Sequence, residues 1–343
     1  MDDLGAGVLP DRELAQVLAH GGLSSTAPLD PDQIQPASVD LRLGAVAYRL
    51  RASFLPGAGV TVAARLQEPL VMHRIDLAAG AVLETGCVYL VPLMERAALD
   101  ARLHGAANPK SSTGRIDVFT RLIVDGAQAF DHVPPGYHGP LYAEICPRTF
   151  SILARTGDRL SQLRLRRGPV QELRAAEFSI DLARSGPAGF RAKRHAGVID
   201  LARIGGHDPR DYWEPVWSRE GRVVLDPGEF YIFASREPIL IPPDQAGEMA
   251  PIRPELGEFR AHYAGFFDPG FGMPPHPGRA VLEVRSRDVA FILEHAQAVG
   301  RLVFEPLTGR PEKLYGEAGS NYRGQGLKLS KHFSDWHEPG EDA

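Results

Sequence analysis

One polar stretch between two apolar segments groups residues that suit a negatively charged ligand. In "NPKSSTGRIDVF", residues 108–119, Lys110 and Arg115 supply two cations, and Ser111, Ser112 and the threonine after them supply three hydroxyls. Gly114 allows backbone N–H groups to approach a ligand, so the stretch suits phosphate. The alternative is an ordinary polar loop, which is what a short Ser/Thr/Gly run most often is.

Two glutamates lie inside apolar stretches that have the pattern of strands. Glu144 lies in "PLYAEI" and Glu283 in "RAVLEV". Partial burial raises the pKa of a carboxyl group and suits it to accept a proton near neutral pH. The alternative is that each glutamate faces solvent, because alternate positions of a strand do.

The elements that must position these residues are mainly strands. The 29 prolines and 36 glycines divide the chain into short segments, which favours β structure over long helices. Alternating or fully apolar patterns predict strands at "ASVDLRL", "CVYLVPL", "RLIVD", "PLYAEI", "SQLRLRR", "FYIFAS", "RAVLEV" and "GRLVFEPL". One helix is expected near the start, in "PDRELAQVLAHG", where three apolar residues share a face.

The second half of the chain repeats the pattern of the first. "VLETGCVYLVPL" resembles "VLDPGEFYIFAS", and "FDHVPPGYHGPLYAEI" resembles "FDPGFGMPPHPGRAVLEV". The matched pairs are Tyr89 and Tyr231 (142 apart), Asp131 and Asp268 (137 apart), and Glu144 and Glu283 (139 apart). A period this long indicates two homologous domains, because solenoid repeats span about 20–50 residues. We therefore predict a mainly β chain of two tandem β-barrel or jelly-roll domains, residues 1–185 and 195–343.

Composition limits the classes of function. The net charge of −5 and the pI near 6.2 disfavour a nucleic-acid or membrane-surface binder, because the basic residues are interspersed with acids. We find no leader pattern and no run of about 18 apolar residues, so we expect a soluble, cytoplasmic protein. Two cysteines, Cys87 and Cys146, are too few for a disulfide framework or a cysteine-rich zinc site.

The motifs, in their order, resemble those of the dCTP deaminases in the dUTPase superfamily. They are "LPDRELAQVLAHGGL", "IQPASVDLRLG", "KSSTGR", "GPLYAEI", "DRLSQLRL", "GRLVFEPLTG" and "NYRGQG". The resemblance covers most of the chain and is weakest around residues 209–219. The usual family member is about half as long, so this chain resembles a duplicated form with dUTPase-like barrels.

The resemblance implies roles for particular residues. Ser111, Ser112 and Arg115 match the segment that binds the triphosphate and supplies a catalytic serine, with Lys110 where arginine is common. The glutamate that activates the attacking water is implied to be Glu144 or Glu283. In the tail that closes over the phosphates the matching residues are Tyr322, Arg323 and Gln325. Asn321 replaces a lysine of this tail, for which Lys328 or Lys331 is a candidate substitute.

The chemistry of cytosine deamination agrees with these residues. It needs a nucleophilic water, a proton for N3 and the departing ammonia, and stabilisation of the tetrahedral centre. Zinc deaminases use an H-x-E and P-C-x-x-C arrangement, and no C-x-x-C occurs here. We therefore expect metal-free activation of water by a glutamate, with Mg²⁺ bound through the nucleotide triphosphate and no zinc.

Each half lacks a motif that the other half keeps. The second-half counterpart of "KSSTGR" falls in "MAPIRPELG", residues 249–257, which has no serines, and the first half has no counterpart of "NYRGQG". We therefore hypothesise one complete site per chain, assembled from both halves. The resemblance further implies a homotrimer or another homo-oligomer.

Several other features are assigned structural roles. The basic run Arg164–Arg167 is interpreted as the guard of an edge strand. Asp40 is interpreted as fixing a strand and turn. Phe266, Phe267 and Phe271 are interpreted as core or subunit interface rather than a platform for base stacking.

Three functions remain open from sequence. The first is hydrolytic deamination of dCTP to dUTP and ammonia. The second is a bifunctional dCTP deaminase and dUTP diphosphatase, or a plain dUTPase. The third is a non-catalytic nucleotide-binding regulator, which would bind without turnover.

Overall fold

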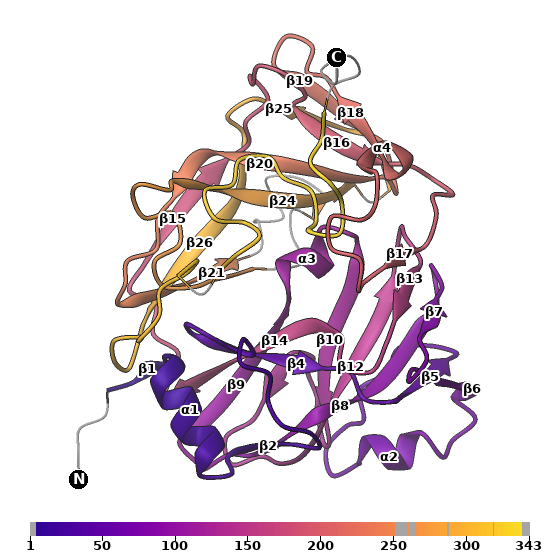
Figure 1. Ribbon diagram of the computed structural model, residues 1–343, viewed down its shortest axis with the longest axis vertical. Coiled ribbons are helices and arrows are strands. Elements are labelled where there is room, and N and C mark those ends of the chain that lie inside the picture. Colours follow the sequence, from indigo (N-terminus) through magenta and orange to yellow (C-terminus); the bar gives the residue numbers. More distant parts are fainter. Residues whose placement is uncertain (1–4, 251–258, 261–264, 287, 318, 338–343) are drawn as a thin grey trace.

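The computed structural model describes the chain except residues 1–4, 251–258, 261–264, 287, 318 and 338–343. Strands dominate the described part, and its four helices are α1 (Asp11–Ala19), α2 (Val62–Arg65), α3 (Ser111–Gly114) and α4 (Pro209–Tyr212). No helix in this part is long and apolar enough to cross a membrane. In Figure 1 the first half (indigo to magenta) lies below the second half (orange to yellow), with α3 between them.

The first half contains two main sheets and a small one. Its strands are β1 (Gly7–Val8), β2 (Leu23–Ser25), β3 (Ile34–Gln35), β4 (Ser38–Arg42), β5 (Val46–Leu50), β6 (Val71–Asp76), β7 (Ala81–Leu83), β8 (Val88–Ala98), β9 (Leu103–Pro109), β10 (Val118–Val124), β11 (His132–Val133), β12 (His138–Pro147), β13 (Ile152–Ala154) and β14 (Arg159–Arg167). One sheet has the order β11-β9-β14-β4-β3, the other β10-β12-β8-β5-β6, and β13 pairs with β7.

The second half repeats this strand order. Its strands are β15 (Arg174–Ser179), β16 (Gly189–Ala192), β17 (Ile199–Asp200), β18 (Trp213–Val216), β19 (Arg222–Leu225), β20 (Phe230–Ile239), β21 (Gln245–Ala250), β22 (Phe259–Arg260), β23 (Phe266–Phe267), β24 (Gly278–Ser286), β25 (Phe291–Glu294) and β26 (Ala298–Pro306). The sheets are β23-β21-β26-β15, β22-β24-β20-β16-β18 and β25-β19. The predicted mainly β fold with an internal duplication is confirmed.

A single hydrogen bond illustrates how closely the halves correspond. The Tyr89 hydroxyl accepts from the backbone N–H of Glu84 at 2.9 Å, and the Tyr231 hydroxyl accepts from that of Asp226 at 3.0 Å. The first hydrogen bond fixes the turn before the long strand β8, and the second fixes the turn before β20. The pairing of these tyrosines in the sequence therefore corresponds to an equivalent structural position.

The switch from first-half to second-half sheets lies before the expected boundary at residues 185–195. β15 pairs with β26, so sheet membership changes between β14 and β15. Later in the chain, β17 returns to pair with β13 of the first half, and Phe333 near the chain end packs into the first-half core. Sheet pairing, which a single sequence does not reveal, therefore places the boundary differently from the Gly/Pro-rich segment.

The basic run in β14 is not the guard of an edge strand. β14 is a central strand, paired with both β9 and β4. The Arg166 guanidinium binds both carboxylate oxygens of Glu305 on β26 at 2.6 Å, and Arg164, which is 0% exposed, donates to the carbonyl of Gly247 on β21 at 3.1 Å. Strand alternation turns these two arginines toward the second half, and Leu163 and Leu165, which alternate with them, toward the first-half core. The run therefore joins the two halves.

Candidate active site

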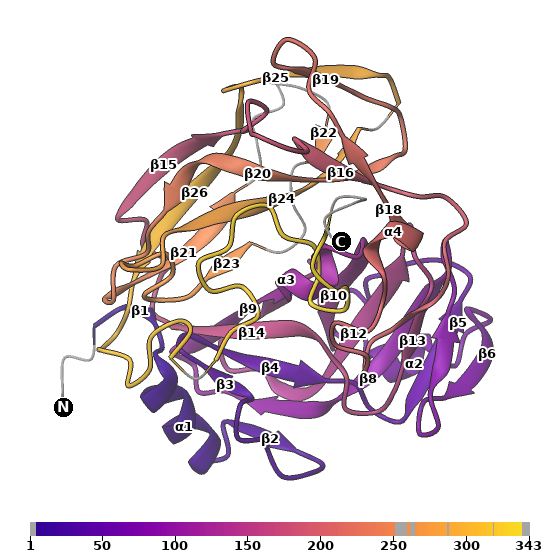
Figure 2. The ribbon, with the colours of Figure 1, turned by 45° about the horizontal axis from the view of Figure 1, so that its top comes forward.

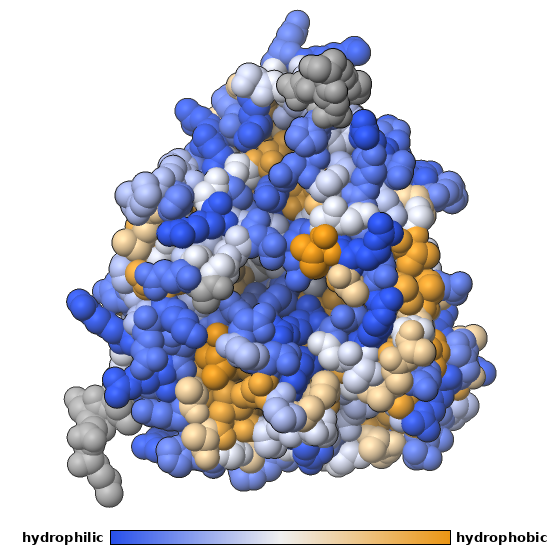
Figure 3. Space-filling model, in the orientation of Figure 1, coloured by the Kyte–Doolittle hydropathy of each residue, from blue (hydrophilic) through white to orange (hydrophobic). Residues whose placement is uncertain are grey.

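A cavity of about 670 Å³ lies between the two halves and takes residues from both. Figure 3 shows a mainly hydrophilic recess in the middle of this face. The first half contributes Lys110, Ser111, Ser112 and Arg115, and the second contributes Glu283, Asn321, Tyr322 and Gln325. Three residues of the predicted site, Glu144, Arg323 and Lys328, are not among the lining residues.

The polar motif forms a sharp turn at the end of a strand. Lys110 has extended backbone at the end of β9, and the single turn α3 follows directly. Ser112 and the next two residues are buried, whereas the first serine, Ser111, is partly exposed on the cavity wall. The strand-to-helix change therefore places a serine hydroxyl and a lysine ammonium on one side of the cavity.

The C-terminal tail closes onto this turn within the same chain. The Arg115 guanidinium donates to Oε1 of Gln325 at 2.7 Å and to the carbonyl of Lys328 at 3.0 Å, and its Cζ lies 4.0 Å from the centre of the Tyr322 ring. The Ser330 hydroxyl donates to the carbonyl of Ser112 at 2.8 Å. Figure 2 shows the yellow tail beside α3. Segments more than 200 residues apart therefore meet in one site, as the hypothesis of a composite site requires.

The two candidate glutamates have different surroundings. Glu283 is 2% exposed and packs on α3: a Cβ atom added to Gly114 would lie 2.3 Å from its Oε1. Glu144 is equally buried, but its carboxylate binds Arg121 of the neighbouring strand β10 at 2.6 Å. Only Glu283 borders the cavity that also holds the serines.

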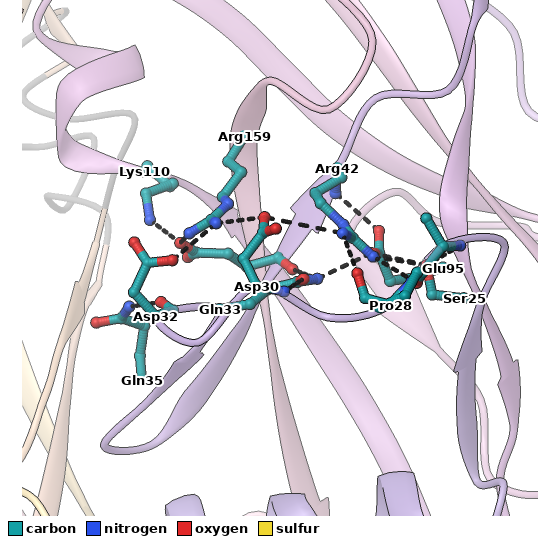
Figure 4. A network of polar contacts seen from close by, with 12 residues as sticks. Ser25, Pro28, Asp30, Asp32, Gln33, Gln35, Arg42, Glu95, Lys110 and Arg159 are labelled. Carbon is teal, nitrogen blue, oxygen red and sulfur yellow. Dashed lines mark hydrogen bonds and ion pairs between the residues drawn. The ribbon is translucent and has the colours of Figure 1, made fainter.

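Cations and carboxylates gather at one end of the cavity. Lys110 forms an ion pair with Asp40, and Arg159 lies 3.5 Å from the same carboxylate and binds Asp32 at 2.8 Å (Figure 4). Lys331 also borders the cavity, and burial lowers the pKa of its ammonium. Asp40 therefore lies in the site itself, which the purely structural interpretation of this residue did not include.

The two lysines proposed to replace the missing tail lysine differ in position. Lys331 borders the cavity near Lys110. Lys328 instead points to Asp335, with 3.6 Å between ammonium and carboxylate, and the two side chains are 41% and 77% exposed. Of the two, Lys331 is the one placed to reach a ligand.

Three buried polar atoms on the cavity wall lack a hydrogen-bond partner within the described part of the chain. They are Oδ1 of Asp40, Nε of Arg115 and Oδ1 of Asp268. Burial raises the pKa of Asp268 to about 6. Because buried polar groups are seldom left unpaired, these atoms are suited to a polar ligand.

Sequence reasoning did not assign Asp268 or His332 to the site. The sequence repeat pairs Asp268 with Asp131, and this pairing was the one feature of the sequence that singled out Asp268. His332 borders the cavity, and burial lowers its pKa to about 3, which keeps the ring neutral. Phe267 and Phe271 belong to the second-half core, as expected, and they also border the cavity together with Phe266.

Comparison with known proteins identifies the family. The model of the 2′-deoxycytidine 5′-triphosphate deaminase N-terminal domain matches residues 5–169, and the model of the C-terminal domain matches residues 159–333. The chain belongs to the dCTP deaminase family. It is accordingly an enzyme of the dCTP-deaminating class. Family membership therefore disfavours the interpretation as a non-catalytic nucleotide-binding regulator.

A solved structure and curated relatives agree with this membership of the dCTP deaminase family. The crystal structure of 2′-deoxycytidine 5′-triphosphate deaminase from Agrobacterium tumefaciens is 51% identical, covers 90% of this chain and 99% of its own, and has a TM-score of 0.85. The dCTP deaminase of Halorubrum lacusprofundi is 31% identical over 162 residues, 46% of this chain and 75% of its own length. A "dCTP deaminase, dUMP-forming" from Methanothermobacter thermautotrophicus is 31% identical over 159 residues, 44% of this chain and 75% of its own length.

Proposed function

We propose that this enzyme converts dCTP to dUTP and ammonia by hydrolysis, with Glu283 activating the water. The observation that supports the proposal is the meeting of Glu283 from the second half with Ser111 and Arg115 from the first half in one cavity. These residue types match the needs of the reaction: a carboxylate base, a hydroxyl and a fixed cation.

Glu283 is the proposed proton carrier. Its carboxylate takes a proton from the attacking water and delivers it to N3 of the ring. It then takes the remaining proton from the hydroxyl of the tetrahedral centre and delivers it to the amino group, so that the C–N bond breaks and ammonia leaves. Ser111 and Arg115 also line the cavity, and we assign the hydroxyl and the guanidinium to the developing tetrahedral centre. Arg115 is held in place by Gln325 and Tyr322, so closure of the tail also orients this cation.

Lys110, Ser112 and Lys331 are the proposed triphosphate ligands. Two ammonium groups and a turn of backbone N–H groups suit phosphate oxygens. We propose that Mg²⁺ enters with the triphosphate and neutralises part of its charge. Among the described residues no three His, Cys, Asp or Glu side chains gather as metal ligands, and the proposal has the phosphate oxygens hold the ion.

The product is open to one alternative. Several relatives are named dUMP-forming, which implies that in those proteins diphosphate is removed as well. The same cavity would then perform two hydrolytic reactions. The products are separable by chromatography, and diphosphate release is measured independently.

The test follows ammonia release from dCTP with Mg²⁺, with the nucleotide product identified by chromatography. Wild-type protein should form dUTP, and Ser111→Ala and Glu283→Gln should each lose turnover, whereas Glu144→Gln should keep it. Loss of turnover in Glu144→Gln with full activity in Glu283→Gln would reverse the assignment. Formation of dUMP and diphosphate would support the alternative. Sedimentation velocity measures the proposed homotrimer separately.

A further inference from the structure

Asp117 belongs to the polar motif but has no part in the chemistry above. It follows Arg115 by two residues, is 0% exposed and is not among the residues that line the cavity. Its backbone has φ of 54°, in the left-handed region that costs a non-glycine residue free energy. A buried charge in such a conformation indicates a specific partner.

That partner is Arg285 of the second half. The two side chains form an ion pair, with Asp117 0% and Arg285 15% exposed. The Thr149 hydroxyl donates to Oδ2 of Asp117 at 2.5 Å and accepts from Nη2 of Arg285 at 2.8 Å, so it joins both partners. The backbone of Asp117 is fixed as well, since its carbonyl accepts from the N–H of Arg148 at 2.9 Å.

The ion pair lies next to the proposed base in both segments. On β24, Arg285 follows Glu283 by two residues, so the two side chains point to the same face of the sheet. On the facing segment, Asp117 follows Gly114 by three residues, and its N–H donates to the carbonyl of Gly114 at 2.9 Å. Glu283 meets Gly114 and Arg285 meets Asp117, which gives two contacts in register between β24 and the motif.

We propose that Asp117 and Arg285 form a positioning pair that holds Glu283 at its working distance from Ser111 and Arg115. Neither residue touches the cavity in this proposal, and both act through Glu283. One contact alone would let β24 pivot on α3, whereas two contacts fix its direction and its distance. The proposal rests on the assignment of Glu283 as the base.

The pair can be separated from general stability by a matched control. Glu305→Gln breaks another buried ion pair between the halves, the one with Arg166, and neither of these residues lines the cavity. Asp117→Asn keeps the size and left-handed tolerance of the residue and removes its charge. Arg285→Lys keeps the charge and loses the planar fork.

The experiment measures kcat and KM for dCTP and thermal unfolding for Asp117→Asn, Arg285→Lys, Arg285→Gln and the double variant Asp117→Asn/Arg285→Gln. We expect kcat to fall by roughly 10- to 100-fold in Asp117→Asn, with KM changed less than about threefold, because displacement of a reacting group by about 1 Å has such an effect. The double variant should be no worse than the poorer single variant. Arg285→Lys should keep more turnover than Arg285→Gln, and Glu305→Gln should lose thermal stability and keep kcat.

Full kcat in Asp117→Asn would overturn the proposal, as would a loss of kcat in Glu305→Gln of the same size. Glu283→Gln, assayed in parallel, separates the assignment of Glu283 as the base from the proposal of the positioning pair. If Glu283→Gln remains active, the proposed base is wrong. If it is inactive while Asp117→Asn is fully active, only the positioning pair is wrong.

Discussion

Alanine at Gly114 should displace the proposed base without unfolding the protein. An added Cβ would lie 2.3 and 2.4 Å from the two carboxylate oxygens of Glu283 and 2.5 Å from its Cδ, whereas ordinary contacts begin at 3.4 Å. Glu283 must therefore retreat by about 1 Å, which for a reacting group costs about 100-fold in rate, or about 2.7 kcal/mol of transition-state stabilisation. Gly114 is not among the residues with positive φ, so its backbone accepts alanine.

Steady-state kinetics with dCTP test this displacement. We expect kcat to fall about 100-fold in Gly114→Ala while the nucleotide still binds. Gly5→Ala is the matched control, because a Cβ there meets nothing within 4 Å. In the Glu283→Ala background the same substitution at Gly114 should cost no stability, since the clash has been removed. Wild-type kcat in Gly114→Ala would refute the assignment of Glu283 or the close contact on which it depends.

Three further predictions concern charge. Lys331→Met should raise KM for dCTP about 10-fold or more and Lys328→Met should change it little, because only Lys331 borders the cavity; steady-state kinetics measure both. Glu305→Gln should lower the free energy of unfolding in urea by about 1.5–3 kcal/mol, since buried Arg166 loses the charge of Glu305 and keeps only that of Glu248. Burial raises the pKa of Asp268 to about 6 from 3.8, so the folded protein keeps a proton that the unfolded chain releases. This stabilisation, about 3 kcal/mol, is complete below about pH 4 and is lost as the pH rises through about 6. Burial also raises the pKa of Asp131 to about 7, so urea titrations should show a smaller loss in Asp268→Asn than in the wild type.

The repeated strands were predictable because local pattern and local structure coincide in them. Every stretch predicted as a strand lies on one, from β4 to β26, and the helix predicted near the start is α1. Alternation and turn residues are sufficient for this, since Gly or Pro lies at or near at least one end of each of these strands. The pairing of Tyr89 with Tyr231 then predicted which strands are equivalent.

The partners across the two halves were not predictable from one sequence. The alternating arginines of β14 would have the same sequence pattern on an edge strand and on a central strand that binds Glu305. What distinguishes the two cases is which strands pair with β14 on either side, and the sequence does not show this. The counterpart of the polar motif, expected at residues 249–257, falls mostly outside the described residues. The domain boundary depends on the pairing of β15 with β26, a contact over more than a hundred residues.

The two equivalent glutamates, Glu144 and Glu283, have different surroundings in the two duplicated halves. In the first half, the Glu144 carboxylate forms an ion pair with Arg121 of the same domain. The Cζ atom of Arg121 lies 3.5 Å from the centre of the Phe130 ring. In the second half, Glu283 reaches α3 of the other domain, where Gly114 leaves room for it. The separation of serines and tail into different halves therefore favours one proposed site per chain, at the interface where Glu283 faces the motif.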